Sequence, residues 1–519
     1  MALGEETRSK VKSDYHRPSG SGAGGDAIPF MIDGTYHVFE LASPPGTIHH
    51  PGRLRTSWVR QRSNDLIHWT RDADPIVTPG SSSSDFDESG CWTGSAVIGP
   101  DGNMRIFYTG YKDGGNQVIL EAKSNDRHGL TGFTKPERPI KIDAGSAGGR
   151  YETVDFRDPF VFYQEEEKRY WMLVATRLTE GPYWTRGCVA LLTSSDLDSW
   201  TVEDQPLYAP NNLYCPECPE MFTLGKGKWY LAYSRFSAPS SGTLYVMADS
   251  PRGPWRSPRD GSGGRLDGRR WYAAKSCPKA NDPSKRLSFA WVHDYCEEDG
   301  RWLWGGTLTQ PREISSIEDG SLVVSVLPEF LQSLKTVPLP TTLGQTFPSE
   351  VQIESIGAAT TRSLPVSSPP PGSTLCFSFS VATPDAKEFG ILLQFSDDMR
   401  GYKVAFEQIA GDVYSVTLLT DLAPFDQFWA DLTNHHIPKL IDGAELVKHN
   451  AVKLDKTVHV LLMEDIVEVF VGGKVLTHRL PRREKNVGHD EPVSEISTLG
   501  MYVEDGSARF EDLQLRQSP

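Results

Sequence analysis

Three carboxylates in the first half of the sequence precede aromatic strands by similar distances, 10 residues for Asp26 and 12 residues for both Asp158 and Glu217. Carboxylates that a fold brings together repel one another, and such clusters serve metal binding or acid–base chemistry. A pair with one member charged and the other protonated is what cleavage of a glycosidic bond requires. The spacings therefore predict a carboxylate site, provided that the fold places all three at one end of a channel.

The neighbours of two of these carboxylates are expected to separate their pKa values. Arg157 precedes Asp158, and its guanidinium is expected to keep that carboxylate ionised. Glu217 lies between two Cys-Pro pairs, at 215–216 and 218–219. This less polar setting is expected to raise the pKa of Glu217.

Aromatic side chains are expected around the same channel. The points that match Asp158 and Glu217 in two other copies of the pattern are Trp92 and Lys275, and Tyr272 lies just before the latter. Together with Trp58 and Trp304, Trp92 and Tyr272 offer flat apolar faces suited to sugar rings.

The elements that must position these residues repeat five times. An apolar strand, a turn and an aromatic-rich strand recur, and the Asp-Gly and Gly-Lys-Gly turns are typical of β-hairpins. Equivalent points in successive copies are 68, 66, 59 and 58 residues apart, at Tyr36, Met104, Tyr170, Trp229 and Leu287.

A Ser-x-Asp turn that leads to an aromatic residue has the same period. It is clear at 63–69 and 195–200 and looser at 124–133 and 249–255. Repeats of about 60 residues, each with room for four short strands, are typical of a five-bladed β-propeller. In a propeller the first strand of each blade lines the central channel, so equivalent residues converge there. A large β-sandwich with chance similarities is the alternative.

After the repeats the pattern changes. Residues 321–345 are interpreted as a linker with one short amphipathic turn, between a propeller domain at 1–320 and a second domain at 346–519. Short alternating strands and a Gly-Gly hairpin at 467–476 predict a β-sandwich for this second domain. The polar stretch 425–450 is interpreted as an insertion or a short helical excursion. The predicted fold class is therefore all-β, a five-bladed β-propeller followed by a C-terminal β-sandwich.

Composition excludes several classes of partner. The 519 residues carry 53 basic and 68 acidic side chains, a net charge of −15, which argues against nucleic acid or an anionic membrane as a partner. No run approaches 18 apolar residues, and the first residues lack the apolar stretch of a signal peptide.

Seven cysteines, an odd and sparse set, predict free thiols and a cytoplasmic location, or secretion if a leader was removed. A lone Cys-x-x-Cys at 215–218 predicts no zinc site, and we expect no metal and no cofactor.

Three motifs resemble those of glycoside hydrolase family 32, the fructan-active family of invertases, inulinases, levanases and fructosyltransferases. They are Trp92-Thr-Gly-Ser95, Arg157-Asp158-Pro159 and Glu217-Cys218-Pro219. The stretches 58–69, 266–275, 303–312 and 467–474 also resemble family segments, so the resemblance covers nearly the whole chain.

The resemblance implies a role for each carboxylate. Asp26 would be the nucleophile, Asp158 the transition-state stabiliser and Glu217 the acid/base of a retaining glycosidase that acts on β-fructofuranosides, with hydrolysis or fructosyl transfer as the outcome. The residues expected to bind the carbohydrate substrate are Trp58, Trp92, Ser95, Arg157, Cys218, Tyr272 and Trp304.

The first block departs from the family pattern. The family has Trp-x-Asn-Asp-Pro-Asn-Gly where this chain has Gly25-Asp26-Ala27-Ile28-Pro29, and Leu41 stands where many members have Gln. These departures indicate a divergent branch, such as an exo-enzyme on levan or fructo-oligosaccharides or a levan fructotransferase. Two other functions stay open: an inverting arabinan-type glycosidase of the family 43 kind, and a non-catalytic carbohydrate-binding propeller.

Overall fold

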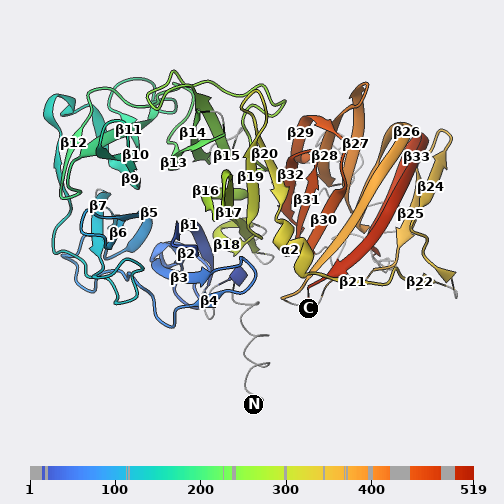
Figure 1. Cartoon of the computed structure of the whole chain (residues 1–519), viewed down its shortest axis with the longest axis horizontal. Coiled ribbons are helices and arrows are strands. Elements are labelled where there is room, and N and C mark those ends of the chain that lie inside the picture. Colours follow the sequence, from blue (N-terminus) through green and yellow to red (C-terminus); the bar gives the residue numbers. More distant parts are fainter. Residues whose placement is uncertain are drawn as a thin grey trace, which may run out of the picture. The chain divides into compact units, whose positions relative to one another are not determined.

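The computed structural model describes residues 15–17, 22–112, 114, 117–225, 227–236, 241–296, 301–342, 345–366, 369, 372–395, 401–420, 445–480 and 497–518 (Figure 1). Most of the described residues lie in β-strands, and helix among them is limited to short turns such as α2 (Pro328–Ser333), η1 (Gly52–Leu54) and η2 (Gly145–Ala147). The all-β prediction is therefore confirmed. None of the helices in these ranges is long or apolar enough to span a membrane.

The chain divides into two compact units. The first comprises Met1–Pro258, Arg269–Asp294 and Trp302–Val323, and the second comprises Arg259–Gly268, Tyr295–Arg301 and Val324–Pro519. The domain bounds predicted from the sequence, 1–320 and 346–519, differ by assigning the short segments 259–268 and 295–301 to the first domain.

The first unit is built from groups of antiparallel strands, each formed by consecutive parts of the chain. Figure 1 shows these groups following one another around a common centre. The first group contains β1 (Gly24–Ile32), β2 (Thr35–Ala42), β3 (Ser57–Ser63) and β4 (Thr70–Arg71), and the second contains β5 (Gly90–Ile98), β6 (Met104–Tyr111) and β7 (Val118–Lys123). The third contains β8 (Lys141–Asp143), β9 (Tyr151–Gln164), β10 (Arg169–Leu178), β11 (Gly187–Ser194) and β12 (Ser199–Val202), and the fourth contains β13 (Glu217–Leu224), β14 (Lys228–Arg235) and β15 (Gly242–Ala248). The last contains β16 (Trp271–Lys279), β17 (Asp282–Cys296), β18 (Arg301–Leu308) and β19 (Arg312–Ser316), and β20 (Leu322–Val326) extends its sheet.

Apolar side chains between neighbouring groups hold the first unit together. One core contains residues of β1–β3 and of β5–β7, the next joins β5–β7 to β9–β11, and a third joins β9–β11 to β13–β15. Apolar contacts thus cover the facing sides of the first four groups, as burial of both faces of a short sheet requires.

The repeated Ser-x-Asp motif forms the same turn in two groups. Asp65 Oδ1 accepts hydrogen bonds from the backbone N–H groups of residues 67 and 68, and Asp196 Oδ1 accepts them from residues 198 and 199. The indole N–H groups of Trp69 and Trp200 each donate to a turn carbonyl at 3.1 Å. The motif therefore has a structural role, because its side chains form hydrogen bonds with the backbone of the same turn.

The innermost strand of every group carries a β-bulge at the same place. The extra residue follows Gly25 in β1, Trp92 in β5, Arg157 in β9, Glu217 in β13 and Tyr272 in β16. A bulge bends its strand and re-aims the side chains beside it. Asp158, Cys218 and Ala273, each directly after the residue that opens the bulge, have φ angles of 60°, 51° and 53°.

The second unit is a large antiparallel sheet wrapped around one core. Two long strands, β26 (Thr374–Phe395) and β33 (Ser497–Gln517), pair along most of their length (Figure 1). The first part of β26 pairs with β30 and the last part with β27, so two layers share one core. The other strands are β21 (Lys335–Val337), β22 (Thr341–Thr342), β23 (Gln345–Thr346), β24 (Val351–Ser355), β25 (Thr360–Leu364), β27 (Tyr402–Ala410), β28 (Val413–Thr420), β29 (Glu445–Lys453), β30 (Val458–Met463), β31 (Ile466–Val471) and β32 (Lys474–Arg479). Of the polar stretch 425–450, residues 445–450 lie in β29, and the remainder lies outside the described residues.

Candidate active site

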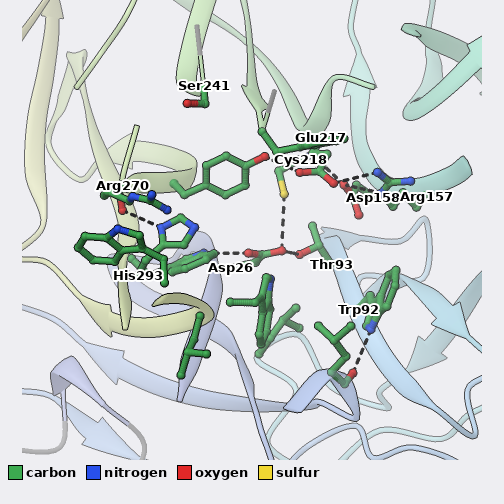
Figure 2. A pocket seen from close by; sticks show the side chains of 18 of the residues that line it. Asp26, Trp92, Thr93, Arg157, Asp158, Glu217, Cys218, Ser241, Arg270 and His293 are labelled. Carbon is green, nitrogen blue, oxygen red and sulfur yellow. Dashed lines mark hydrogen bonds and ion pairs between the residues drawn. The ribbon is translucent and has the colours of Figure 1, made fainter. Parts of the chain in front are cut away.

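The bulges sort the residues at the centre of the first unit into two layers. The residues that open a bulge are Gly25, Trp92, Arg157, Glu217 and Tyr272, and the residues directly after the opening position are Asp26, Thr93, Asp158, Cys218 and Ala273. Except for Gly25 and Ala273, all of them line one cavity of about 710 Å³ (Figure 2). The predicted convergence of three carboxylates from three separate repeats is therefore what the structure has.

Asp26, 9% exposed, is held by neutral hydrogen-bond donors. Its side chain accepts hydrogen bonds from Thr93 Oγ1, from the indole Nε1 of Trp291 at 2.9 Å and from the thiol of Cys218 at 3.6 Å. Burial raises the pKa of Asp26, the hydrogen bonds from Thr93 and Trp291 oppose that rise, and the negative charge of Glu217 adds to it. The donors favour the charged carboxylate that a nucleophile must be.

Hydrogen bonds that involve backbone N–H groups fix the position of Asp158. The N–H of Cys218 donates to Asp158 Oδ2 at 2.8 Å, and the N–H of Asp158 itself donates to Thr109 Oγ1 at 2.8 Å. Arg157 Nε lies 3.8 Å from Asp158 Oδ2. Arg157 favours the ionised form of Asp158, as expected, but burial of this side chain, 5% exposed, outweighs the guanidinium and raises the pKa of Asp158.

Glu217 is the carboxylate that faces open space. Its side chain is 22% exposed, Arg157 Nη2 lies 2.8 Å from Oε1, and the hydroxyl of Tyr272 donates to Oε2. Burial raises the pKa of Glu217 in the direction predicted, and the charge of Asp158 adds to this, whereas Arg157 and Tyr272 oppose it. A carboxyl with a raised pKa and access to water suits a group that must both donate and accept a proton.

Aromatic rings form much of the wall. Trp92 stacks on Tyr111 with ring centroids 3.9 Å apart, and its indole N–H donates to the carbonyl of Leu54. Trp304, from β18, lies against Gly25, where an added Cβ would be 2.7 Å from the ring atom Cη2. Trp92, Tyr272 and Trp304 all line the cavity, as predicted, together with Arg157 and Cys218.

Two predicted substrate-binding residues do not reach the cavity. Trp58 is fully buried between the first two groups of strands, and its indole N–H donates to the backbone carbonyl of Trp92 at 3.0 Å. Ser95 is three residues along β5 from Trp92, below the bulge, and its hydroxyl joins β5 to β9 by donating to the carbonyl of Pro159 and accepting from the N–H of Val161. Contrary to the prediction, neither residue lines the cavity.

Strand register pairs the acids of the repeats differently from their spacing along the chain. Strand register places Glu217 opposite Ser234 as it places Arg157 opposite Ala175, so Glu217 is equivalent to Arg157 and Asp158 to Cys218. The equal 12-residue offset arises because the β13–β14 turn is one residue shorter than the β9–β10 turn. In the last group the equivalent of Glu217 is Tyr272, while Lys275 lies deeper and donates to the carbonyl of Gly94.

Several residues of the site were not predicted from the sequence. Thr93 and Trp291 bind Asp26, and Asp155 binds Arg157 Nη1 at 2.5 Å. Thr93 directly follows Trp92, and an alignment on the bulges would have put it level with Asp26. Trp291 lies on a second strand and reaches the neighbouring group, which sequence spacing does not reveal.

Within the described ranges, no group of three or more His, Cys, Asp or Glu side chains is arranged to hold a metal ion. All seven cysteines are free, and burial raises the pKa of Cys218 well above the ordinary thiol range. Cys218 is therefore a hydrogen-bonding thiol in this site.

Comparison with curated proteins adds an independent finding. The levanase of Bacillus sp. (strain L7) is 28% identical over 546 aligned positions, which cover 98% of this chain and 52% of the levanase. Fructan 6-exohydrolase of Beta vulgaris is 26% identical over 320 positions, 57% of this chain and 50% of that protein. The chain spans about half the length of the curated relatives it matches.

Solved structures share the fold along the whole chain. Fructan 1-exohydrolase IIa from Cichorium intybus has a TM-score of 0.68 at 18% identity, over 97% of this chain and 96% of that chain. Exo-inulinase from Aspergillus awamori has a TM-score of 0.67 at 19% identity, over 97% of both chains. The predicted class, a β-propeller with a β-sandwich, is confirmed.

The family model for the Glycosyl hydrolases family 32 N-terminal domain matches residues 27–325, more than half of the chain, beginning one residue after Asp26. The match contains the Arg-Asp-Pro and Glu-Cys-Pro motifs whose acids meet in the cavity. The chain therefore belongs to glycoside hydrolase family 32.

Proposed function

We propose that this protein is a retaining glycosidase that cleaves β-fructofuranosides in fructans, fructo-oligosaccharides or sucrose-type substrates. The observation that carries the proposal is the contrast between two acids of one cavity. Asp26 is 9% exposed and bound by neutral donors, whereas Glu217 is more open and bound by Arg157 and Tyr272. Two carboxyls in different settings are what a double-displacement mechanism uses.

In the first step Asp26 attacks the anomeric carbon of the fructosyl unit. The bond to the leaving oxygen breaks, and protonated Glu217 transfers its proton to that oxygen, so a covalent fructosyl-Asp26 ester and a free leaving group result. Asp158, held by the N–H of Cys218, is placed to accept hydrogen bonds from the fructose hydroxyls, which strengthen as positive charge develops on the ring.

In the second step ionised Glu217 takes a proton from water, whose oxygen attacks the anomeric carbon and releases the Asp26 carboxylate. A sugar hydroxyl in place of water gives fructosyl transfer, because both nucleophiles compete for the same ester. Two displacements at one carbon retain its configuration. This mechanism predicts Asp26 and Glu217 carboxyls about 5–5.5 Å apart during catalysis.

The similarity to a levanase and to fructan 6-exohydrolase supports a fructan as the substrate class. Leu41, in place of the family's glutamine, lines the cavity and supports a pocket that differs from that of ordinary invertases.

We also infer the finer architecture. The successive groups of strands in the first unit are interpreted as five blades of a propeller at 1–320, joined by a linker at 321–345 to a sandwich at 346–519. The cores between the first and second, the second and third, and the third and fourth groups support this interpretation.

Product analysis tests the proposal. The protein is incubated separately with sucrose, levan, inulin and an arabinan oligosaccharide, beside a Glu217→Gln variant. We expect free fructose, or new fructosyl products, from at least one fructoside, with a loss of about 10²–10⁴-fold in the variant. Arabinose release without fructose release would favour the inverting glycosidase, and no product from a folded protein would favour the non-catalytic carbohydrate-binding propeller.

A further inference from the structure

We propose that an aromatic platform beside the cavity, formed by Tyr183, Trp184, Tyr214 and Phe236, binds a distant sugar ring of the substrate chain on the leaving-group side. This inference rests on the proposed function, and it implies that the preferred substrates are longer fructan chains rather than disaccharides.

The platform concentrates exposed aromatic surface. In the described part of the chain, the aromatic residues with the largest exposed fractions are Phe86, Tyr163, Tyr183, Trp184 and Phe236, at 41%, 42%, 51%, 67% and 45%. Three of these five lie in this one cluster, and Trp184 has the largest exposed fraction. Exposed apolar patches of this kind mark interaction sites.

The rings are in mutual contact. The ring centroid of Tyr214 lies 5.6 Å from that of Tyr183, 5.2 Å from that of Trp184 and 5.4 Å from that of Phe236. Tyr183 and Trp184 belong to the loop between β10 and β11, whereas Phe236 directly follows β14. Two neighbouring groups of strands therefore build one surface.

A buried charged network holds the platform in place. The guanidinium of Arg177, 2% exposed, lies over the rings of Tyr183 and Tyr214 at 4.2 and 4.0 Å. It also donates to the Tyr214 hydroxyl, to the carbonyl of Tyr183 and to Asp155. Rings fixed in this way lose little conformational entropy when a ligand stacks on them, so binding is favoured.

The platform is continuous with the catalytic cavity. Tyr214 and Phe236 line that cavity, and Tyr214 is only three residues before Glu217, which limits their Cα separation to about 11 Å. Asp155 contacts both the Tyr214 hydroxyl and Arg157, which binds the proposed acid/base Glu217. The leaving group departs from the side of the acid that protonates it, so the remainder of a fructan chain runs toward these rings.

The chemistry of the rings fits a sugar. Flat aromatic faces with a polar edge, such as the Tyr183 and Tyr214 hydroxyls 3.3 Å apart, combine apolar contact to C–H groups with hydrogen bonds to hydroxyls. The two units of a disaccharide lie on either side of the cleaved bond, so neither reaches the platform. Only longer chains extend to it.

The test compares chain lengths. In Trp184→Ala we expect the ratio of kcat/KM for levan to kcat/KM for sucrose to fall about tenfold, the equivalent of one lost stacking contact, with Trp184→Phe retaining most of the ratio. Tyr163→Ala, which removes an exposed aromatic ring from β9, is the matched control and should leave the ratio as it is. Calorimetric binding of levan oligosaccharides to Glu217→Gln, with and without Trp184→Ala, gives a readout independent of turnover and should show the same tenfold loss.

The possible failures are distinguishable. If the parent cleaves both substrates and Trp184→Ala keeps both the ratio and the affinity, the platform is overturned and the proposed function stands. If the folded parent cleaves neither of these substrates nor inulin, the proposed function fails instead. A melting temperature of Trp184→Ala equal to that of the parent ensures that a change in ratio reports on binding.

Discussion

At the scale of single residues, the three acids of the site differ in the groups that bind them. All three are raised in pKa by burial, so burial by itself does not assign their roles. The partners do: neutral donors for Asp26, backbone N–H for Asp158, and a guanidinium with a phenol for Glu217. Titrations of such neighbouring acids are coupled, because each negative charge raises the pKa of the others.

Tyr272→Phe tests the tuning of the acid/base. The phenol donates to Glu217 Oε2 and stabilises its charged form, so its removal raises the pKa of Glu217 further. The enzyme needs protonated Glu217 in the first step, and the alkaline limb of the kcat/KM–pH profile should therefore move to higher pH. Tyr163→Phe, which removes an exposed hydroxyl elsewhere, should keep the limb in place. A limb that does not move, or that moves to lower pH, would contradict the assignment.

Thr93→Val tests the proposed nucleophile. The hydroxyl of Thr93 favours charged Asp26, so the nearly isosteric valine should raise the pKa of Asp26. Asp26 must be charged to attack, and the acidic limb of the profile should move to higher pH, with a greater loss of activity below the optimum than at it. Thr70→Val, at an exposed strand position, serves as the control. An acidic limb equal to that of the parent would remove Asp26 from this role.

At the scale of elements, the bulge on each innermost strand decides what reaches the cavity. It places two successive residues at the channel, where a regular strand would turn every second side chain away. The left-handed backbone at Asp158 and Cys218 costs about 1–3 kcal/mol per residue and persists because neighbouring groups hold it. In β1 the opening position is Gly25, and the ring of Trp304 fills the space that a side chain would need.

Gly25→Ala tests that close approach. The added Cβ would lie 2.7 and 2.8 Å from two atoms of the Trp304 ring, so the ring must move within the cavity. We expect a loss of about 1–3 kcal/mol in stability and a rise in KM for the fructoside, measured by thermal unfolding and steady-state kinetics. Gly52→Ala, whose nearest neighbouring atom would be 3.6 Å from the new Cβ, is the control. Unchanged stability and KM in Gly25→Ala would contradict the packing argument.

At the scale of the whole molecule, the first unit depends on contacts between its first and last groups of strands. Gly24 in β1 pairs with Gly306 in β18, and the buried guanidinium of Arg53 forms an ion pair with Asp294 at 2.6 Å. Trp291 also crosses this junction to reach Asp26. The contacts that close the unit therefore also hold part of the site.

Asp294→Ala tests the closure. The variant leaves Arg53, 2% exposed, without the carboxylate at its Nη2, and removing one member of a buried pair costs about 3–5 kcal/mol. We expect a lower free energy of unfolding in urea and reduced fructoside cleavage, because Trp304 and Asp26 lie at the same junction. Asp33→Ala, which removes an exposed partner of Arg127, should unfold like the parent. An Asp294→Ala protein as stable as the parent would show that the pair does not close the unit.

The sequence by itself determined the all-β class, the repeating unit and the three carboxylates. These follow from local rules: alternation of apolar residues, turn residues, and the Ser-x-Asp turn with its aromatic residue. Any chain with these patterns buries the same faces, so they could be read without knowing which strands meet. The motifs around Asp158 and Glu217 are likewise contiguous, and the resemblance to the family depended on them.

Only the tertiary structure decided which side chains face the cavity. Turn lengths differ between repeats, so counting along the chain made Glu217 equivalent to Asp158 and Lys275 equivalent to both, whereas strand register separates them. Trp58 and Ser95 are residue types that fit a sugar site, but their side chains form hydrogen bonds that join neighbouring strands. Contacts such as those of Trp291 with Asp26 join residues 265 apart in sequence, and their existence depends on how the groups of strands close around one centre.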